Sequence, residues 1–155
     1  MNIRFTLLFI SQIIFLCVLP AQNVRVVTQN NLTIGRIEPG EAINISPANS
    51  QAAKFMITAE KSGTYSILFT LPSFLLSLSG NAELPVHYDG SSAMYSTTPY
   101  SATGTFFDPR QNLILYLKEG TPLYLWLGIQ SHPAKFQQAG NYAANITLSV
   151  QLQKY

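Results

Sequence analysis

Strict alternation of apolar and polar residues is the feature that most limits how this chain can fold. Within 54–59, Phe55 and Ile57 fall on one side of an extended backbone, and the same period of two recurs at 65–71 and 146–152. A β-strand produces this period because its successive side chains point to opposite faces. No segment carries a convincing 3.6-residue helical period, so the sequence predicts an all-β protein.

Turn-forming residues divide the alternating sequence into short strands, roughly one turn every ten residues. Pro72 ends one strand, Gly80 and Asn81 end the next, and Asp89 with Gly90 ends a third. The side chains predicted to face inward in these strands and in the last one are Tyr65, Ile67, Phe69, Leu71, Leu76, Leu78, Leu84, Val86, Tyr88, Ile146, Leu148, Val150 and Leu152.

The fold predicted from this pattern is a single immunoglobulin-like, two-sheet antiparallel β-sandwich over residues 22–155, after an N-terminal signal helix. Two stretches interrupt the alternation. Residues 91–111 are predicted to be irregular strand and long loop, and residues 130–141 to be a second long connection. Pro39 and Gly40 fit the central positions of a type II turn, in which glycine supplies the positive φ.

Residues 1–21 have the pattern of a secretory signal peptide: Met-Asn-Ile-Arg, an apolar run, then Leu-Pro-Ala. The stretch from Phe5 to Pro20 is 16 residues long, shorter than the roughly 20 that a membrane span needs. Lipidation at Cys17 is the less favoured alternative, because Leu16 precedes it where a small residue is usual. We expect an extracytoplasmic protein (secreted, periplasmic or at the cell surface) that meets the membrane only during export.

Composition limits the partners and the chemistry. Charged residues are 10% of the chain and the formal net charge is +2. No basic stripe is present, so a nucleic-acid partner is not expected. The sequence has no Gly-x-Ser-x-Gly elbow, zinc-ligand spacing, phosphate-binding loop or calcium loop, and no cysteine follows residue 21. We therefore expect a protein that is not an enzyme and uses neither a cofactor nor a metal.

His87 and Asp89 are the nearest approach to a chemical pair, because residues two apart in a strand share a face. They would form an imidazole–carboxylate pair, or two metal ligands with a third brought by the fold. The favoured interpretation is a solvated strand end before Gly90. His132, followed by proline, is predicted to lie in a loop.

Residues 112–128 are predicted to form a hairpin that is apolar on both faces. A turn at 119–121 sets Tyr116 opposite Tyr124 and Ile114 opposite Trp126, which places all four on the face that a sandwich usually gives to water. Either 91–111 covers these four side chains as a secondary core, or they form a surface for a partner, for polymerisation or for a glycan.

Several segments, in order along the chain, together resemble a known family. They are Leu32 to Gly40, Phe55 to Thr58 followed by Gly63 to Ile67, Leu113 to Gly128, and Gly140 to Tyr142. The resemblance is to a bacterial secreted family, domain of unknown function four-four-zero-two, related in fold to spore-coat-U-like and fimbrial β-sandwiches. It implies a central hairpin, a late hairpin and an exported sandwich. It implies no catalytic residues, because that family has none assigned. This chain departs from it in being richer in aromatic residues.

Two functions are compatible with these observations. The first is a structural or adhesive, fimbria-like component of the cell surface that contacts copies of itself or other surface proteins. The strand at Val24–Val27 would then pair with its own sandwich or with a neighbour's groove. The alternative is a carbohydrate-binding module that uses the outward aromatic residues.

Overall fold

The computed structural model describes residues 23–35, 37–79 and 81–153. The predicted signal segment, with Cys17, lies outside these residues. The described chain is all-β, as predicted, and every sheet is antiparallel. The strands are β1 (Val24–Asn30), β2 (Ile43–Ile45), β3 (Ala53–Ala59), β4 (Gly63–Thr70), β5 (Phe74–Ser77), β6 (Glu83–Pro85), β7 (Ala93–Ser96), β8 (Thr105–Phe107), β9 (Leu113–Leu117), β10 (Pro122–Leu127), β11 (Ile129–Ser131), β12 (Tyr142–Ala143) and β13 (Thr147–Leu152), with a 3₁₀ turn η1 (Ser101–Thr103).

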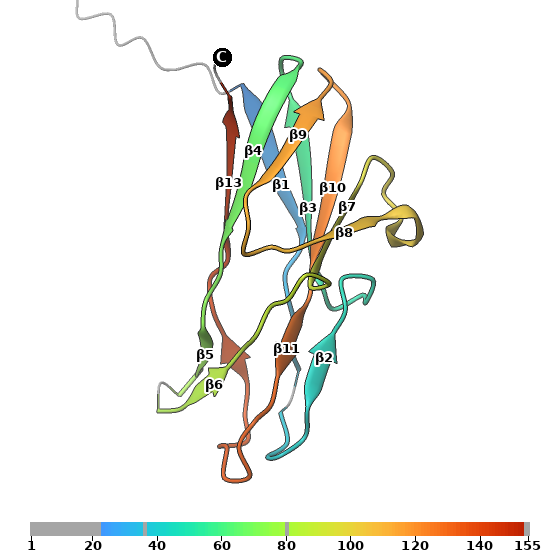
Figure 1. Cartoon of the computed structure of the whole chain (residues 1–155). Helices are drawn as coiled ribbons and strands as arrows, with labels where there is room; N and C mark the ends of the chain where they lie inside the picture. The colour runs from blue at the N-terminus through green and yellow to red at the C-terminus, as the bar shows by residue number, and fades with distance from the viewer. Residues whose placement is uncertain (1–22, 36, 80, 154–155) are drawn as a thin grey trace, which may run out of the picture.

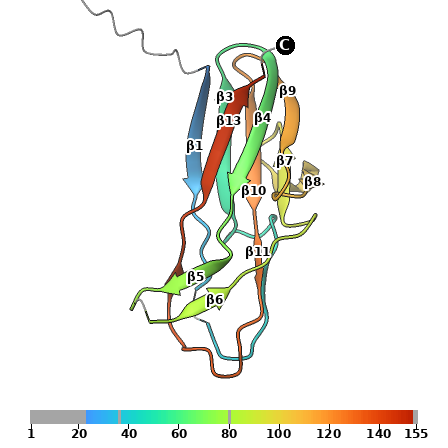
Figure 2. The ribbon, with the colours of Figure 1, turned by 60° about the vertical axis from the view of Figure 1, so that its left-hand side comes forward.

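Two sheets face each other in the half of the molecule drawn uppermost in Figures 1 and 2. The main sheet has the order β1-β3-β10-β7-β8, and the β4 sheet has the order β13-β4-β9. The smaller sheets β12-β5-β6 and β11-β2 make up the other half. They continue the same layers, because β4 runs into β5, β10 into β11 and β12 into β13 after short breaks.

The core lies between these layers and includes many of the side chains that alternation predicts. Phe55 of β3 and Tyr65, Ile67 and Phe69 of β4 are all buried. The Phe69 ring joins the layers, with centroid distances of 5.8 Å to Phe55 and 6.3 Å to Phe107. Aromatic pairs at such distances stabilise the packing beyond the area they bury.

The prediction for the strand after Pro72 is wrong by one residue. Leu76 and Leu78 are 48% and 74% exposed, whereas Leu75 is 4% exposed. The break between β4 and β5 changes which face each side chain occupies, and a shift of one residue moves every side chain to the opposite face. Leu84, Val86 and Tyr88 are buried as predicted, and Leu148, Val150 and Leu152 are half-buried because β13 lies at a sheet edge.

Both predicted hairpins are wrong. β3 and β4 do not pair with each other, and neither do β9 and β10. Instead β3 pairs with β10 in the main sheet, and β4 pairs with β9 in the β4 sheet. The connections at 60–62 and 118–121 are therefore arches that cross from one sheet to the other. The alternation specifies which side of a strand is buried but not which strand lies beside it.

Local interactions hold the ends of the sandwich. The Tyr65 hydroxyl contacts the carbonyl oxygens of Lys61, at 2.9 Å, and Asn23, at 3.0 Å. The Tyr142 hydroxyl donates to the Gln138 carbonyl at 2.6 Å. The predicted turn at residues 39–40 is present, with Gly40 at φ +76°. Its closing hydrogen bond runs from the amide of Glu41 to the carbonyl of Glu38 at 3.3 Å.

The other predicted segments are found partly as expected. β1, which contains Val24–Val27, pairs antiparallel with β3 of its own sandwich. Residues 91–111 contain two short strands, β7 and β8, joined around η1, which projects from the side of the sandwich in Figure 1. Residues 130–141 begin in β11 and then form a loop.

Candidate functional site

The arch at 118–121 separates the four residues predicted to share one aromatic surface. Ile114 and Tyr116 lie on β9 in the β4 sheet, whereas Tyr124 and Trp126 lie on β10 in the main sheet. Tyr116 is paired with Thr64 rather than with Tyr124. The predicted single patch is therefore wrong, because it depended on a hairpin that does not form, and its two halves have to be considered separately.

The outward side of the β4 sheet holds the first half. We call it the β4 face, and it consists of Thr64, Ser66, Leu68, Thr70, Ile114, Tyr116, Thr147, Ser149 and Gln151. None of these nine residues is charged. Tyr116 is 70% exposed, Ile114 57% and Leu68 42%. Within this face, the exposed apolar groups thus lie among neutral hydroxyl and amide side chains.

The outward side of β10 holds the second half, and it is partly covered. Trp126 is only 6% exposed and Tyr124 is half-buried. The Lys54 ammonium lies 5.2 Å from the centroid of each of these two rings. It also donates a hydrogen bond to the Pro99 carbonyl at 2.9 Å. The prediction that residues 91–111 cover the aromatic side chains therefore holds for Trp126, which is buried beside Pro99 and Lys54.

A concave site lies beside Trp126. We call it the Tyr100 hollow, and its volume is about 620 Å³. Two loops wall it, at 48–50 and 99–102, and the end of β1 closes a third side. Its lining combines aromatic, amide and hydroxyl side chains with one ammonium group: Gln29, Asn30, Ala48, Asn49, Ser50, Ala52, Lys54, Pro99, Tyr100, Ser101, Ala102 and Trp126.

A second groove, of about 380 Å³, lies between the chain after β1 and the break between β12 and β13. Its apolar lining includes Leu32, Ile34, Phe55 and Ile146. It marks the open side of the sandwich, where β1 and β13 are the edge strands of the two layers.

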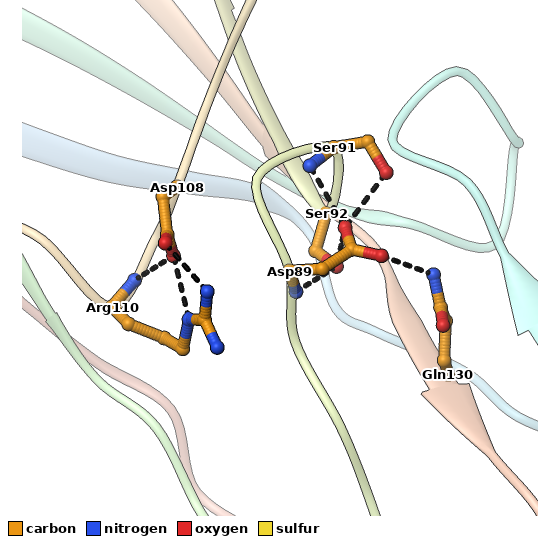
Figure 3. A network of polar contacts seen from close by, with 6 residues as sticks. All are labelled: Asp89, Ser91, Ser92, Asp108, Arg110 and Gln130. Carbon is orange, nitrogen blue, oxygen red and sulfur yellow. Dashed lines mark hydrogen bonds and ion pairs between the residues drawn. The ribbon is translucent and has the colours of Figure 1, made fainter.

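The Asp89 carboxylate of the His87 and Asp89 pair is bonded to the turn that follows it and to Gln130. The Asp89 carboxylate accepts hydrogen bonds from the amide of Ser91 at 2.8 Å and from its hydroxyl at 2.7 Å. It also accepts bonds from Ser92 and from the Gln130 side chain (Figure 3). The Ser91 bonds, supported by those from Ser92 and Gln130, lower the pKa of Asp89 to about 2. His87 is exposed and pairs with Gln130 through its backbone.

Asp108, Arg110 and Tyr88 also have structural settings. The Arg110 guanidinium makes two hydrogen bonds to the Asp108 carboxylate, at 2.9 and 2.7 Å, and these bonds lower the Asp108 pKa (Figure 3). Burial raises the pKa of the Tyr88 hydroxyl to about 12. Within the described ranges, no group of three His, Cys, Asp or Glu residues is placed to hold a metal ion.

Sequence reasoning did not identify Lys54, Tyr100 or Leu68 as candidate site residues. Lys54 is the polar residue of an alternating strand, and Tyr100 is one tyrosine of an irregular segment. Only the fold brings them to one hollow, since 46 positions separate them in sequence. Leu68 breaks the outward Thr-Ser alternation of β4, a signal that the sequence did contain.

No protein-family model and no curated protein matches this sequence. In the part of the chain that the structure describes, no helix is long and apolar enough to cross a membrane.

Proposed function

We propose that this protein is an exported, non-enzymatic, immunoglobulin-like β-sandwich that acts as a structural or adhesive component of the cell surface. The observation that carries the proposal is the β4 face, an uncharged sheet surface with three exposed apolar side chains. Interface centres are depleted of charged residues and enriched in aromatic ones, whereas an ordinary solvated sheet face carries charges that prevent association.

A second copy of the chain is the partner that fits this face best. A neutral surface needs no partner of opposite charge, and a two-fold arrangement brings the same patch of each copy together. The strands at the edges of the β4 sheet, β9 and β13, each pair only with β4 among the described strands. Lateral packing or strand addition at these edges would extend the contact, in the manner of a fimbria-like assembly.

Self-association provides the test. Light scattering after size exclusion, over a range of concentrations, is expected to give a mass above that of the monomer. Tyr116→Lys, which places a charge in the β4 face, should return the mass to the monomer and leave the melting temperature nearly unchanged. Phe136→Lys is the matched control, because Phe136 is 98% exposed and lies in the loop after β11. A wild-type protein that is monomeric throughout would contradict the proposal.

Export rests on residues 1–21 and is tested separately. Intact-mass spectrometry of the protein recovered from outside the cytoplasm should show a chain beginning at Gln22 without a lipid. A retained N-terminus, or a lipid on Cys17, would exclude the cleaved signal peptide.

The alternative, glycan binding by one outward patch of Ile114, Tyr116, Tyr124 and Trp126, loses its premise because these residues lie on different sheets. A glycan site needs another location, which the Tyr100 hollow provides.

A further inference from the structure

The Tyr100 hollow has one wall that is held rigid by its own hydrogen bonds. The Asn30 side-chain amide donates to the carbonyls of Ser50, at 2.9 Å, and Ala52, at 2.8 Å. Asn49 closes the turn itself, because its side-chain oxygen accepts from the Gln51 amide at 2.9 Å. These bonds fix the 48–52 loop against the end of β1, so the amide groups on this side hold their positions before any ligand arrives.

The opposite wall is fixed in the same way. The hydroxyls of Ser96, Thr98 and Thr103 contact one another at 2.7 to 3.1 Å. Thr103 also donates to the Tyr100 carbonyl at 3.3 Å, and the Lys54 ammonium donates to the Pro99 carbonyl at 2.9 Å. Tyr100, which is 70% exposed, is thus an aromatic side chain on a braced loop. A preformed site avoids the entropy that ordering a loop would cost on binding.

The charge of the hollow is one-sided. Its lining includes Lys54 but no Asp or Glu. An ammonium group has three donors. Among the described residues, the polar partners of Lys54 are the Pro99 carbonyl and the faces of the Tyr124 and Trp126 rings. The ammonium therefore retains the capacity to bind an anionic oxygen from a ligand.

The remaining lining suits a polyhydroxylated molecule. The side chains of Gln29, Asn49 and Ser101 offer amide and hydroxyl groups, which exchange hydrogen bonds with sugar hydroxyls. Tyr100, which is 70% exposed, offers aromatic surface for the apolar face of a sugar ring, whereas Trp126 lies beneath it at the floor of the hollow. The volume of about 620 Å³ is within the usual range for small-ligand pockets.

We propose that the Tyr100 hollow binds an acidic oligosaccharide, one whose sugar units carry a carboxylate. The carboxylate meets the Lys54 ammonium, the hydroxyls meet the amide wall, and one ring packs on Tyr100. The site lies on the main sheet, away from the β4 face on the other layer, so it does not depend on self-association.

The test is a calorimetric titration with a panel of acidic oligosaccharides: galacturonate trimer, a glucuronate-containing oligomer and sialyllactose. Each is compared with its own methyl ester, which keeps the sugar and removes the charge. We expect at least one acid to bind, and its ester to bind at least tenfold more weakly. No binding by any acid of the panel, or equal binding of acid and ester, would overturn the proposal.

Variants then separate the contribution of the Lys54 charge from that of the Tyr100 ring. Lys54→Gln should weaken binding of the acid about tenfold more than binding of the ester, because both ligands use the wall that Lys54 braces through the Pro99 carbonyl but only the acid uses the charge. Tyr100→Ala should weaken both ligands, and its exposed position keeps the fold intact. Phe136→Ala is the matched control, since Phe136 is an exposed aromatic residue outside the hollow. An unchanged affinity in Tyr100→Ala, or an equal loss in a control, would place the binding elsewhere.

Discussion

Two buried tyrosines should respond in opposite directions to the loss of a hydroxyl group. Tyr65 is 0% exposed, and its hydroxyl contacts two carbonyl oxygens at 2.9 and 3.0 Å. Tyr88 is 9% exposed, and its buried hydroxyl has no hydrogen-bond partner within the described residues. Replacement by phenylalanine keeps the ring in both cases and removes only the oxygen.

The expected magnitudes follow from what each hydroxyl contacts. Tyr65→Phe removes the hydroxyl donor from the Lys61 carbonyl, whereas the Asn23 carbonyl still accepts from the Glu60 amide at 2.9 Å. The loss should lower the free energy of unfolding by about 1–2 kcal/mol. The melting temperature should then fall by about 3–8 °C. Tyr88→Phe removes a buried polar group that makes no bond, so it should raise the free energy of unfolding by up to about 1 kcal/mol.

Urea denaturation of the two variants and the wild type, followed by tryptophan fluorescence, measures both changes. A change of the same sign in both variants would refute the reasoning. Alkaline titration gives a second measure. Because the folded pKa of Tyr88 is raised to about 12 from 10.0, the wild type should lose stability as the pH rises from 10 to 12. Tyr88→Phe should show a smaller loss over that interval.

Three further predictions concern packing, backbone and acid stability. Phe69→Ala should lower the free energy of unfolding by roughly 3–5 kcal/mol, half-buried Leu148→Ala by about 1–2 and exposed Thr147→Ala by less than about 0.5, measured in urea. A larger loss for Thr147 than for Leu148 would show the β13 register to be wrong. Gly128→Ala should disrupt the β2–β11 pairing, seen by amide exchange, because its Cβ would collide with the carbonyl oxygen of Ile45 in β2. Asp89→Asn should remove the pH-dependent part of the folding stability that this carboxylate provides. In the wild type that contribution is complete above the pKa of about 4 that Asp89 has in the unfolded chain, and it is lost as the pH falls through its folded pKa of about 2. Equal acid-unfolding profiles would contradict that prediction.

The accuracy of the sequence-based predictions depended on whether a feature is local. Alternation placed Phe55, Ile67 and Phe69 in the core correctly, because the side of a strand is a property of that strand alone. The same reasoning misplaced Leu76, where the irregular break at Pro72 changed the phase of the pattern. An irregular break of this kind can shift by one residue which side chains of the next strand face the core, and no local sequence pattern indicates the shift.

The candidate sites were harder to predict because they combine distant segments. The four-residue aromatic patch failed because adjacency in sequence was taken for pairing, whereas β9 and β10 lie in different sheets. Lys54 and Tyr100 meet at one hollow only because β3 pairs with β10 and β10 with β7. No local pattern encodes that strand order.

The exchanged pairing of the two arches also determines when the chain can fold. Neither sheet contains a hairpin made from the two strands of one arch. β3 therefore cannot pair with β10, nor β4 with β9, until these later strands have been made, more than 40 residues further along the chain. The outer partner of β4 is β13, the last strand. Chains whose contacts join distant residues fold slowly, because loop closure must precede the contacts that stabilise it. A chain that emerges N-terminus first can therefore complete the main sheet only after β10 has been delivered, and the β4 sheet only after β13.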